Sequence, residues 1–423
     1  MKKASVAIEA FESPASPQLA VLIGIDWADK EHAFCARTPD GKLHHGSFKH
    51  KSAAITEWLS TWTSKYPNLP IDVCLESSRG SLVNALREFQ SVRIYPVNPA
   101  ALAAYRKALA HGGGKNDPVD ARLILKFLEQ NRDHLRCLKL DSPETRELLA
   151  LSAQRRDLVE QRVALANSLG ALWKQYFPAI LELKPARTYM EFVIKLVLKY
   201  PTLEEMQAAG KVKLRAFLYG TGTRRIEERL TILMEAKPFT TDATLIRTSA
   251  RYCQSYAIQI DAINKVIKGY EKEIRRLVKQ HRDYAIFSSL PGAADITFAR
   301  MIATLGDDRT RFDSAESLQA AAGIAPITTQ SGKSRFVNSR WACTKFMKQT
   351  FHEYAGLSLV KCDWAKRFYE SQIAKGKSAQ MAKRALAYKW LRVIYRCWKS
   401  EQPYNEAHYV ARLKATGSKH SKA

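Results

Sequence analysis

The first third of the chain alternates between short apolar runs and longer segments whose apolar residues recur at helical spacing. Residues 19–26 are almost continuously apolar, which is the pattern of a strand buried on both faces, and the run ends at Asp26. Stretches at 31–37 and 43–48 flank the turn Pro39-Asp40-Gly41 and predict a hairpin. The same patterns then predict helices over 52–66 and 82–89, strands over 71–75 and 92–97, and a helix that begins at Asn98-Pro99.

A further helix is expected to open within Lys115-Asn116-Asp117-Pro118-Val119-Asp120-Ala121-Arg122, after a glycine hinge at 112–114. Pro118 suits the first helical position, where its missing N–H costs nothing, and Asp117 is a good N-cap. Asp120 lies one turn beyond Asp117, so both carboxylates can point the same way. Taken alone, this stretch is explained best as a capped helix with an acidic first turn.

The expected order of elements is three strands, helix, strand, helix, strand and helix, which indicates a mixed sheet with helices packed on it. The ribonuclease-H-like fold has this order. In such a sheet Asp26 lies near the central strand and Glu76 ends a neighbouring one, while Asp117 and Asp120 arrive on a helix beside them. Each of these acids taken singly is explained as well by a turn or by a solvated strand end.

Together, the four carboxylates suggest a metal site. Carboxylates that converge on one point repel one another unless a divalent cation holds them, and oxygen ligands of this kind suit Mg²⁺. Two such ions could clamp the attacking and leaving oxygens of a phosphodiester.

Two long helices are expected in the middle of the chain, roughly over 142–281, where Ser142-Pro143 is a clear helix start. The first repeats Leu151, Leu158, Leu165 and Leu172 every seven residues, with Leu148, Arg155, Arg162 and Leu169 as companions; the second alternates steps of three and four from Ile246 to Leu277. The two could form an antiparallel pair, pair with another subunit, or form an ordinary helical hairpin. Arg155 and Arg162 are costly if buried alone, so we expect them to face a partner or a phosphate. Residues 178–240 are interpreted as an insertion of unknown role.

The last domain is expected over roughly 282–415 and is followed by a disordered tail at 416–423. At the other end of the chain, residues 1–18 are expected to form a flexible N-terminus. Residues 287–306 resemble one helix-hairpin-helix element, which presents backbone N–H groups at a glycine turn to a phosphate. The second glycine of that turn is replaced in Pro291-Gly292-Ala293-Ala294, which argues against direct phosphate contact there. Gly332-Lys333-Ser334 mimics the end of a Walker A loop, but Ile327 stands where that loop needs glycine, so ATP binding is excluded.

The net charge is the most informative feature of the composition. The 423 residues carry a formal net charge of +26, and residues 331–423 contribute twenty Lys and Arg against five Asp and Glu. A nucleic acid is therefore the first candidate partner, and the C-terminal part its main electrostatic footprint. The helix expected over 379–399 carries an apolar stripe and a basic one, and the basic stripe is expected to follow a phosphate backbone. Seven scattered cysteines, no membrane-spanning apolar stretch and no secretory signal indicate a reduced, cytoplasmic protein.

Four segments of the first domain resemble the DEDD-type insertion-sequence transposases, which are serine-dependent recombinases guided by a bridge RNA. They are Gly24-Ile25-Asp26-Trp27-Ala28, Leu75-Glu76-Ser77-Ser78-Arg79-Gly80, Val97-Asn98-Pro99 and the stretch from Lys115 to Arg122. The resemblance implies a RuvC-like domain over 19–131 whose acidic tetrad, Asp26, Glu76, Asp117 and Asp120, holds Mg²⁺. It also implies a structured guide RNA, double-stranded DNA from the element ends and the target, and an active site assembled from two subunits of a dimer to tetramer.

The same resemblance singles out one serine in the last domain. Ala322-Gly323-Ile324-Ala325-Pro326 followed by Gln330-Ser331-Gly332 aligns with the family's nucleophile-bearing segment, which implies that Ser331 is the nucleophile. Serine at its normal pKa attacks phosphate poorly, and the tetrad's Mg²⁺ could lower that pKa. The basic, glycine-containing stretch usual after the nucleophile departs from the family pattern here, from Ser334 to Trp341. Candidate nucleic-acid contacts are Lys115 and Arg122 near the tetrad, Lys333, Arg335 and Arg340 after the serine, and Lys389, Arg392, Arg396 and Lys399 on the basic stripe.

The sequence therefore predicts an α/β plus α protein with a ribonuclease-H-like (RuvC-like) first domain, a long helical coiled-coil middle and a mainly helical last domain. The function expected is that of a transposase that cuts and rejoins DNA through a covalent phosphoserine intermediate, with no membrane partner. Two alternatives stay open. One is a RuvC-like metal-dependent endonuclease or resolvase without a serine nucleophile, and the other is a non-catalytic basic nucleic-acid-binding protein.

Overall fold

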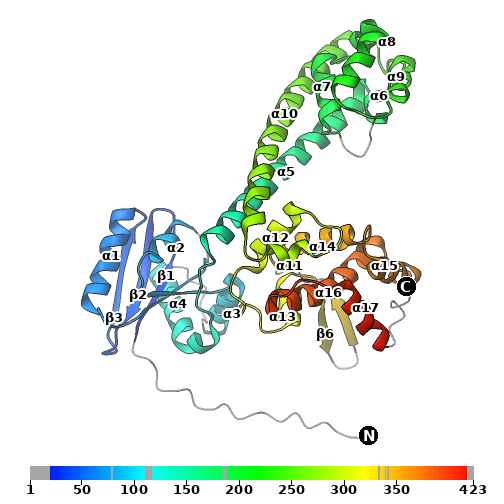
Figure 1. Cartoon of the computed structure of the whole chain (residues 1–423). Helices are drawn as coiled ribbons and strands as arrows, with labels where there is room; N and C mark the ends of the chain where they lie inside the picture. The colour runs from blue at the N-terminus through cyan, green and yellow to red at the C-terminus, as the bar shows by residue number, and fades with distance from the viewer. Residues whose placement is uncertain are drawn as a thin grey trace. The chain divides into compact units, whose positions relative to one another are not determined.

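The computed structural model describes residues 20–77, 80–109, 117–183, 188–331, 334–338, 340 and 343–416. The chain divides into two units, Met1–Leu140 and Asp141–Ala423 (Figure 1). The lead-in expected at 1–18, the hinge at 112–114 and all of the expected tail except Thr416 lie outside the described residues. Among the described residues, no helix is both long and apolar enough to cross a membrane.

The first unit is built on a five-stranded mixed sheet in the order β3-β2-β1-β4-β5, so β1 is the central strand. Strand β2 is antiparallel to β1 and β3, whereas β4 runs parallel to both β1 and β5. The strands are β1 (Val21–Asp26), β2 (Glu31–Arg37), β3 (Leu43–Lys49), β4 (Ile71–Leu75) and β5 (Val92–Pro96), and the helices are α1 (Ser52–Lys65), α2 (Ser81–Leu86), α3 (Pro99–Leu109) and α4 (Asp117–Asn131), with a 3-10 turn at Arg132–His134. The expected mixed sheet and its element order are confirmed, although α2 ends three residues earlier than predicted.

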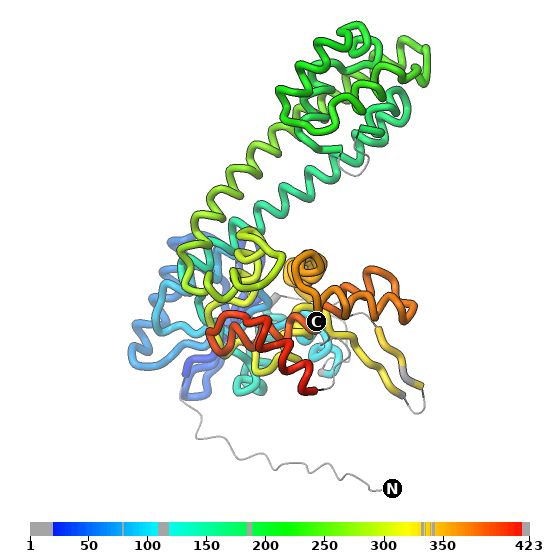
Figure 2. The backbone as a smooth tube through the Cα atoms, turned by 45° about the vertical axis from the view of Figure 1, so that its right-hand side comes forward, coloured from blue at the N-terminus to red at the C-terminus, as the bar shows by residue number. Residues whose placement is uncertain are grey.

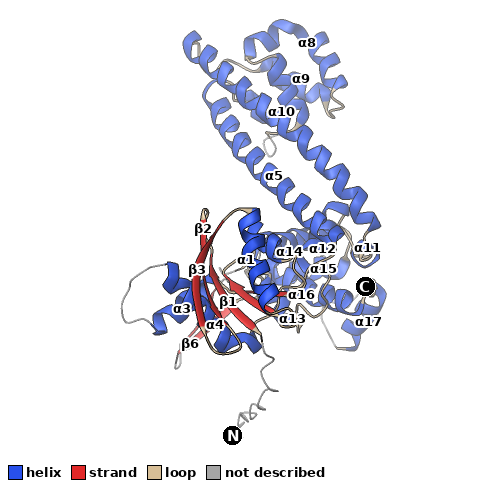
Figure 3. Ribbon diagram, turned by 90° about the vertical axis from the view of Figure 1, so that its left-hand side faces the viewer, coloured by secondary structure: helices blue, strands red, loops and turns tan. Residues whose placement is uncertain are grey.

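The two faces of this sheet are covered by different helices (Figure 3). Val21, Ile23 and Ile25 of β1 pack on one face in a core that includes the buried stripe of α1. The residues between them point to the other face, which α3 and α4 cover. Because side chains alternate along a strand, Gly24 and Asp26 share that second face.

Gly24 is the point at which α4 approaches the sheet. A Cβ atom placed there would lie 2.3 Å from the backbone nitrogen of Leu125 and 2.4 Å from the carbonyl oxygen of Ala121. Only glycine therefore permits the backbone of α4 to lie directly on β1.

Replacing Gly24 with alanine is expected to destabilise the first unit by about 1–3 kcal/mol, because α4 has to move away from β1. Chemical denaturation of the full chain measures the loss. Gly269→Ala is the matched control: nothing lies within 4 Å of a Cβ at that helical position. It should stabilise the protein by up to about 1 kcal/mol. An unchanged midpoint for Gly24→Ala would show that the contact with α4 is looser than described.

The second unit begins with two long helices, α5 and α10, that lie side by side (Figure 1). Its elements are α5 (Pro143–Tyr176), α6 (Ala179–Glu182), α7 (Glu191–Lys199), α8 (Leu203–Gly220), α9 (Ile226–Glu235), α10 (Ala243–Gln280), α11 (Tyr284–Ser288), α12 (Asp295–Leu305), α13 (Ala315–Ala321), β6 (Ile327–Ser331), β7 (Ser334–Asn338), α14 (Lys345–Ser358), α15 (Asp363–Ala374), α16 (Ala379–Ser400) and α17 (Glu406–Ala415). Ser142 caps α5 by accepting a hydrogen bond from the backbone N–H of Thr145.

The contacts between α5 and α10 identify an antiparallel pair within one chain. They run in opposite directions along the two helices: Arg155 meets Glu271 at 2.5 Å, Arg162 donates to Asn264 at 3.0 Å, and Trp173 contacts Cys253 at 2.9 Å. Arg155 is thus ion-paired with α10, whereas Arg162 is hydrogen-bonded to α10 and lies over the ring of Tyr189, so neither arginine is buried without contacts.

The seam of α5 differs from the expected one. Its buried positions include Leu148, Ser152, Ala166, Leu169 and Trp173, whereas the leucines at 151, 158, 165 and 172 are only half-buried. The buried positions of α5 are therefore the companion leucines, Leu148 and Leu169, and residues that each follow a repeating leucine by one position, such as Ser152, Ala166 and Trp173. The seam predicted for α10 is largely confirmed, since Cys253, Ile260, Ile267 and Ile274 are all buried.

The far ends of α5 and α10 join α6 to α9 in a separate hydrophobic core that includes Trp173, Phe192 and Leu214. The other ends join the last domain, whose core contains Trp364, Trp390 and Trp398. That domain is helical apart from the two-stranded hairpin of β6 and β7, which was not predicted. In Figure 2 this hairpin extends away from the helices of its own unit.

Candidate active site

Asp26 and Glu76 lie next to each other at one edge of the sheet. Parallel β1 and β4 are in register up to Gly24 and Cys74, so each acid comes two residues after the last registered pair. Neighbouring strands are about 4.8 Å apart, and residues two apart share a face. Both carboxylates therefore belong to the carboxyl edge of the central strands, on the face that α4 covers. Asp26 is half-buried and Glu76 exposed.

Helix α4 brings Asp120 toward the same edge. Glu129, near the end of α4, pairs with Arg37, which lies opposite Leu22 at the start of β1. Ala121 contacts β1 further along, at Gly24. Helix α4 thus runs antiparallel to β1, and its first turn, with the buried Asp120, lies toward Asp26.

Asp120 is held by a cation of the protein itself. A guanidinium nitrogen of Arg106 on α3 lies 2.6 Å from its carboxylate oxygen. No group of three or more potential metal ligands is gathered closely enough to hold an ion among the residues the structure describes. Arg106 is a site residue that the sequence did not indicate, because nothing in the spacing of α3 and α4 pairs it with Asp120.

The remaining residues of the expected first site are placed less fully. Asp117 is the first residue of α4, but its side chain and all of Lys115 lie outside the described residues. Arg122 is exposed on α4.

A chain of hydrogen bonds ties together three loops at this edge. The backbone N–H of Ala28 donates to Nδ1 of His32, whose Nε2 lies 2.8 Å from Nδ1 of His50. His50 Nε2 in turn lies 2.9 Å from the hydroxyl of Ser81 at the start of α2. Because Nδ1 of His32 accepts, its proton is on Nε2, and the chain runs in one direction from His32 to Ser81. The loop that follows Asp26 is thereby fixed to the starts of α1 and α2.

The chain requires His32 to be neutral, and burial together with nearby His50 lowers the pKa of His32 to about 4. Between pH 6.5 and 4 the unfolded chain binds a proton that the folded chain does not. The free energy of unfolding should therefore fall by up to about 3 kcal/mol as the pH drops through this window. Calorimetry at several pH values measures this. His32→Gln should flatten the dependence, whereas His134→Gln, on the surface of the same unit, should leave it steep.

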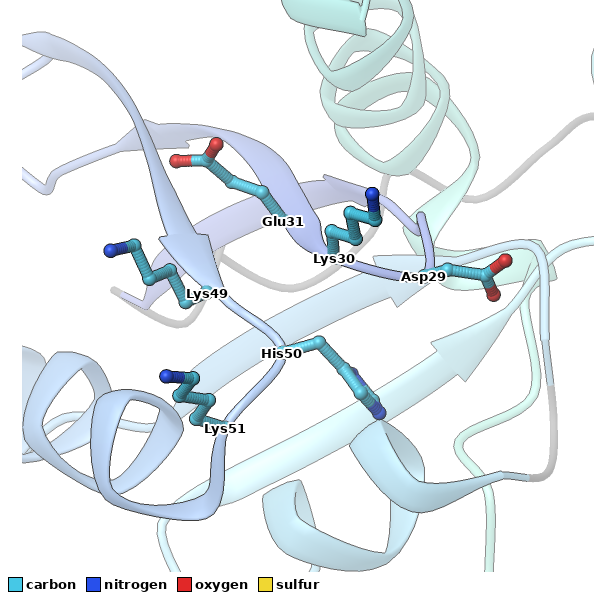
Figure 4. A pocket seen from close by; sticks show the side chains of 6 residues that line it. All are labelled: Asp29, Lys30, Glu31, Lys49, His50 and Lys51. Atoms are coloured by element: carbon cyan, nitrogen blue, oxygen red, sulfur yellow. The ribbon is translucent and has the colours of Figure 1, made fainter.

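A cavity of about 370 Å³ opens beside these loops (Figure 4). It is lined by Asp29, Lys30, Glu31, Lys49, His50 and Lys51. Three lysines against two acids give it a modest positive charge, close in sequence to Asp26. The sequence did not single out these lysines, since they come from two separate loops.

Ser331 lies at the tip of a β-hairpin rather than in a turn. It is the last residue of β6, paired across the antiparallel ladder with Ser334, the first residue of β7. Its own side chain lies outside the described residues, as do Lys333 and the side chain of Arg335. Phe336 and Val337 of β7 are more than 60% exposed. Arg340 follows the hairpin and is half-buried.

The basic stripe of α16 is only partly a surface feature. Arg392 and Arg396 are exposed, and Lys399 is exposed but donates to the carbonyl oxygen of Arg309 at 2.7 Å. Lys389 instead lies over the rings of Trp364 and Phe368, and burial lowers its pKa. Lys389 is therefore a packing residue, while Arg392 and Arg396 are the members best exposed to a phosphate backbone.

Two family models match separate parts of the chain. Residues 23–178 match a transposase model, the DEDD transposase domain of IS110 elements, and residues 284–370 match the Transposase IS116/IS110/IS902 family.

Relatives match over nearly the whole length. The Mini-circle putative transposase for IS117 of Streptomyces coelicolor is 27% identical over 412 residues, which cover 93% of this chain and 98% of that protein. The Insertion element IS900 uncharacterized 42 kDa protein of Mycobacterium paratuberculosis is 26% identical, with 92% and 98% covered. The Insertion element IS110 uncharacterized 43.6 kDa protein of Streptomyces coelicolor is 23% identical, with 89% and 93% covered.

Both the part of the chain that carries the acidic edge of the sheet and the basic helical domain therefore match transposase models. The chain belongs to the IS110/IS116 family of insertion-sequence transposases.

Proposed function

We propose that this transposase cuts and rejoins DNA through Ser331, with the carboxylates of a ribonuclease-H-like (RuvC-like) first domain as the metal-binding half of the site. The serine oxygen attacks a phosphodiester phosphorus, an O–P bond to the protein forms, and one DNA strand leaves as a free hydroxyl end. A hydroxyl of a second strand then attacks the phosphoserine, which releases Ser331. Bond energy is conserved in the protein–DNA link, so rejoining needs no added cofactor energy.

One observation carries this proposal: Asp26 and Glu76 stand side by side at the carboxyl edge of β1 and β4, and α4 directs Asp120 to the same edge. The strand order, with the central strand bearing the first acid, supports the ribonuclease-H-like assignment. At such an edge, carboxylates from neighbouring strands and from α4 can bind one metal ion together beside a phosphate.

The donor set fits Mg²⁺, because the side chains offered are hard oxygen ligands from separate elements. Asp26, Glu76, Asp117 and Asp120 would hold the ion, and Arg106 would have to release Asp120 first. When bound, Mg²⁺ would neutralise charge on the phosphoryl oxygens and lower the pKa of the attacking hydroxyl. The described residues position the loop after Asp26 through His32 and His50, and Arg106 keeps Asp120 neutralised in the meantime.

The proposal includes a structured guide RNA and an assembly of two to four copies. The net charge of +26 supports a large polyanionic partner. The exposed hairpin supports a site that is completed by nucleic acid or by another copy of the chain. A two-stranded ribbon with both faces in water is only marginally stable by itself.

One experiment separates this function from its alternatives. The full chain is incubated with Mg²⁺, the RNA transcribed from the element and DNA carrying the element junction, and the products are run on denaturing gels. A protein–DNA adduct is the expected result. Cleavage without an adduct would instead identify a metal-dependent nuclease, and binding without strand breakage a non-catalytic nucleic-acid-binding protein.

A further inference from the structure

A second polar cavity lies inside the Asp141–Ala423 unit, between α5, α12 and α14. It measures about 300 Å³, ten times a water molecule's share of liquid water. Its lining residues are Ser152, Arg155, Arg156, Val159, Ile296, Thr297, Arg300, Gln349 and Glu353. With three arginines and one glutamate, this cavity is the more strongly cationic of the two described above.

The three arginines are held in place but keep donors for another acceptor. Arg155 pairs with Glu271, Arg156 with Glu160 and Arg300 with Glu353. The guanidinium groups of Arg156 and Arg300 also lie 5.7 and 5.5 Å from the centre of the Phe346 ring. A guanidinium has five N–H groups, so each of these pairs leaves further donors. Planar arginine forks that are already ordered are well suited to a phosphate.

Ser152 gives an independent indication that a ligand is missing. Its side chain is 3% exposed, it lines the cavity, and its hydroxyl has no hydrogen-bond partner in the part of the chain that the structure describes. A buried hydroxyl without a partner costs free energy, and native proteins rarely leave one so. An anion in the cavity would accept its proton.

The turn before α12 packs against α14, which also lines the cavity. Gly292 has φ of +81°, and a Cβ there would lie 2.4 Å from the carbonyl oxygen of Leu357 at the end of α14. The glycine turn of the helix-hairpin-helix-like segment is thus packed against α14. The residues of this segment that line the cavity are Ile296, Thr297 and Arg300 of α12.

We propose that this cavity binds a phosphodiester group of a nucleic-acid backbone, through Arg155, Arg156, Arg300 and the hydroxyl of Ser152. The proposal deepens the proposed function by adding a contact to the nucleic-acid backbone that does not involve Ser331 or the carboxylates. It rests on the family's action on nucleic acid, and it needs no serine chemistry. Binding without Mg²⁺ tests it separately from adduct formation.

Fluorescence anisotropy measures the affinity of the full chain for nucleic acid over a range of salt concentrations. The two probes are labelled duplex DNA of arbitrary sequence and labelled single-stranded RNA. Arg156→Gln and Arg300→Gln should each weaken binding of at least one probe by about tenfold. Each should also reduce the slope of log K against log salt by about one. The probe that loses affinity identifies the nucleic acid that the cavity holds.

Two further variants keep the result interpretable. Ser152→Ala removes one atom, so it should raise or preserve the melting temperature while weakening the same probe several-fold. Arg276→Gln is the matched control: this exposed arginine on α10 pairs with Glu273 and lies outside the cavity. It should change affinity less than twofold. Folded cavity variants that bind both probes as Arg276→Gln does would overturn the proposal. So would variants that alter only the association of subunits, since the cavity would then receive an acidic side chain from another copy.

Discussion

Ser331→Ala is expected to abolish the covalent protein–DNA adduct, with a loss of at least about 1,000-fold in the rate of strand cleavage, while leaving nucleic-acid binding intact. The size of the effect follows from removing the only atom that forms the new bond, for which alanine offers no substitute. Denaturing gels with labelled junction DNA measure the adduct, and anisotropy measures binding.

The hairpin supplies an unusually close control. Ser334 is the cross-strand partner of Ser331 on the same two-stranded ladder, and two residues separate them in the sequence. Ser334→Ala therefore perturbs the hairpin equally and should keep adduct formation within a few-fold of wild type. Equal losses in both variants would mean that the hairpin matters only for its shape. Cleavage that survives Ser331→Ala would favour a nuclease in which water is the nucleophile.

Local patterns were enough to predict the first unit. Strands buried on both faces give continuous apolar runs, and the turn at Asp40-Gly41 fixes the first hairpin. The ends of two apolar runs were enough to place Asp26 and Glu76 at the ends of neighbouring strands, which β1 and β4 are. The hairpin of β6 and β7 was missed because both of its faces are exposed, so its sequence has no alternation of apolar and polar residues that would predict a strand. The signals present were the β-branched Thr328 and Thr329 and a two-residue loop that begins with glycine.

Contacts between distant segments could not be predicted in the same way. The buried positions of α5 include Ser152, Ala166 and Trp173, each one residue after a leucine of the repeat, because the repeat alone does not show which side of the helix α10 contacts. The pairing of Arg106 with Asp120 and of His32 with His50 depends on how helices and loops meet in space. Neither Arg106, which pairs with a candidate acid, nor the histidines that fix the loop after Asp26 could therefore be predicted from the sequence.

The acids themselves give the second large effect. Asp26→Asn, Glu76→Gln and Asp120→Asn should each reduce Mg²⁺-dependent strand cleavage by about 100-fold or more, because each removes a negative oxygen ligand without changing side-chain size. They should also remove the stabilisation that the ion gives to the folded chain. At ten times its dissociation constant, a bound ion adds about 1.4 kcal/mol to the free energy of unfolding. Melting temperatures measured with and without Mg²⁺ detect this.

Two comparisons make the result specific to the carboxylate edge. Asp133→Asn changes an exposed acid in the 3-10 turn after α4 and should retain both cleavage and the Mg²⁺-dependent shift. Arg106→Gln frees Asp120 from its ion pair, so it should increase the apparent affinity for Mg²⁺ by several-fold, since the ion no longer competes with a guanidinium. A weaker affinity in Arg106→Gln would show that the arginine orders Asp120 for the ion instead of occupying its place. If Asp133→Asn lost as much activity as Asp26→Asn, the loss would follow from the change in net charge, and the carboxylates at the edge of the sheet would not be the metal site.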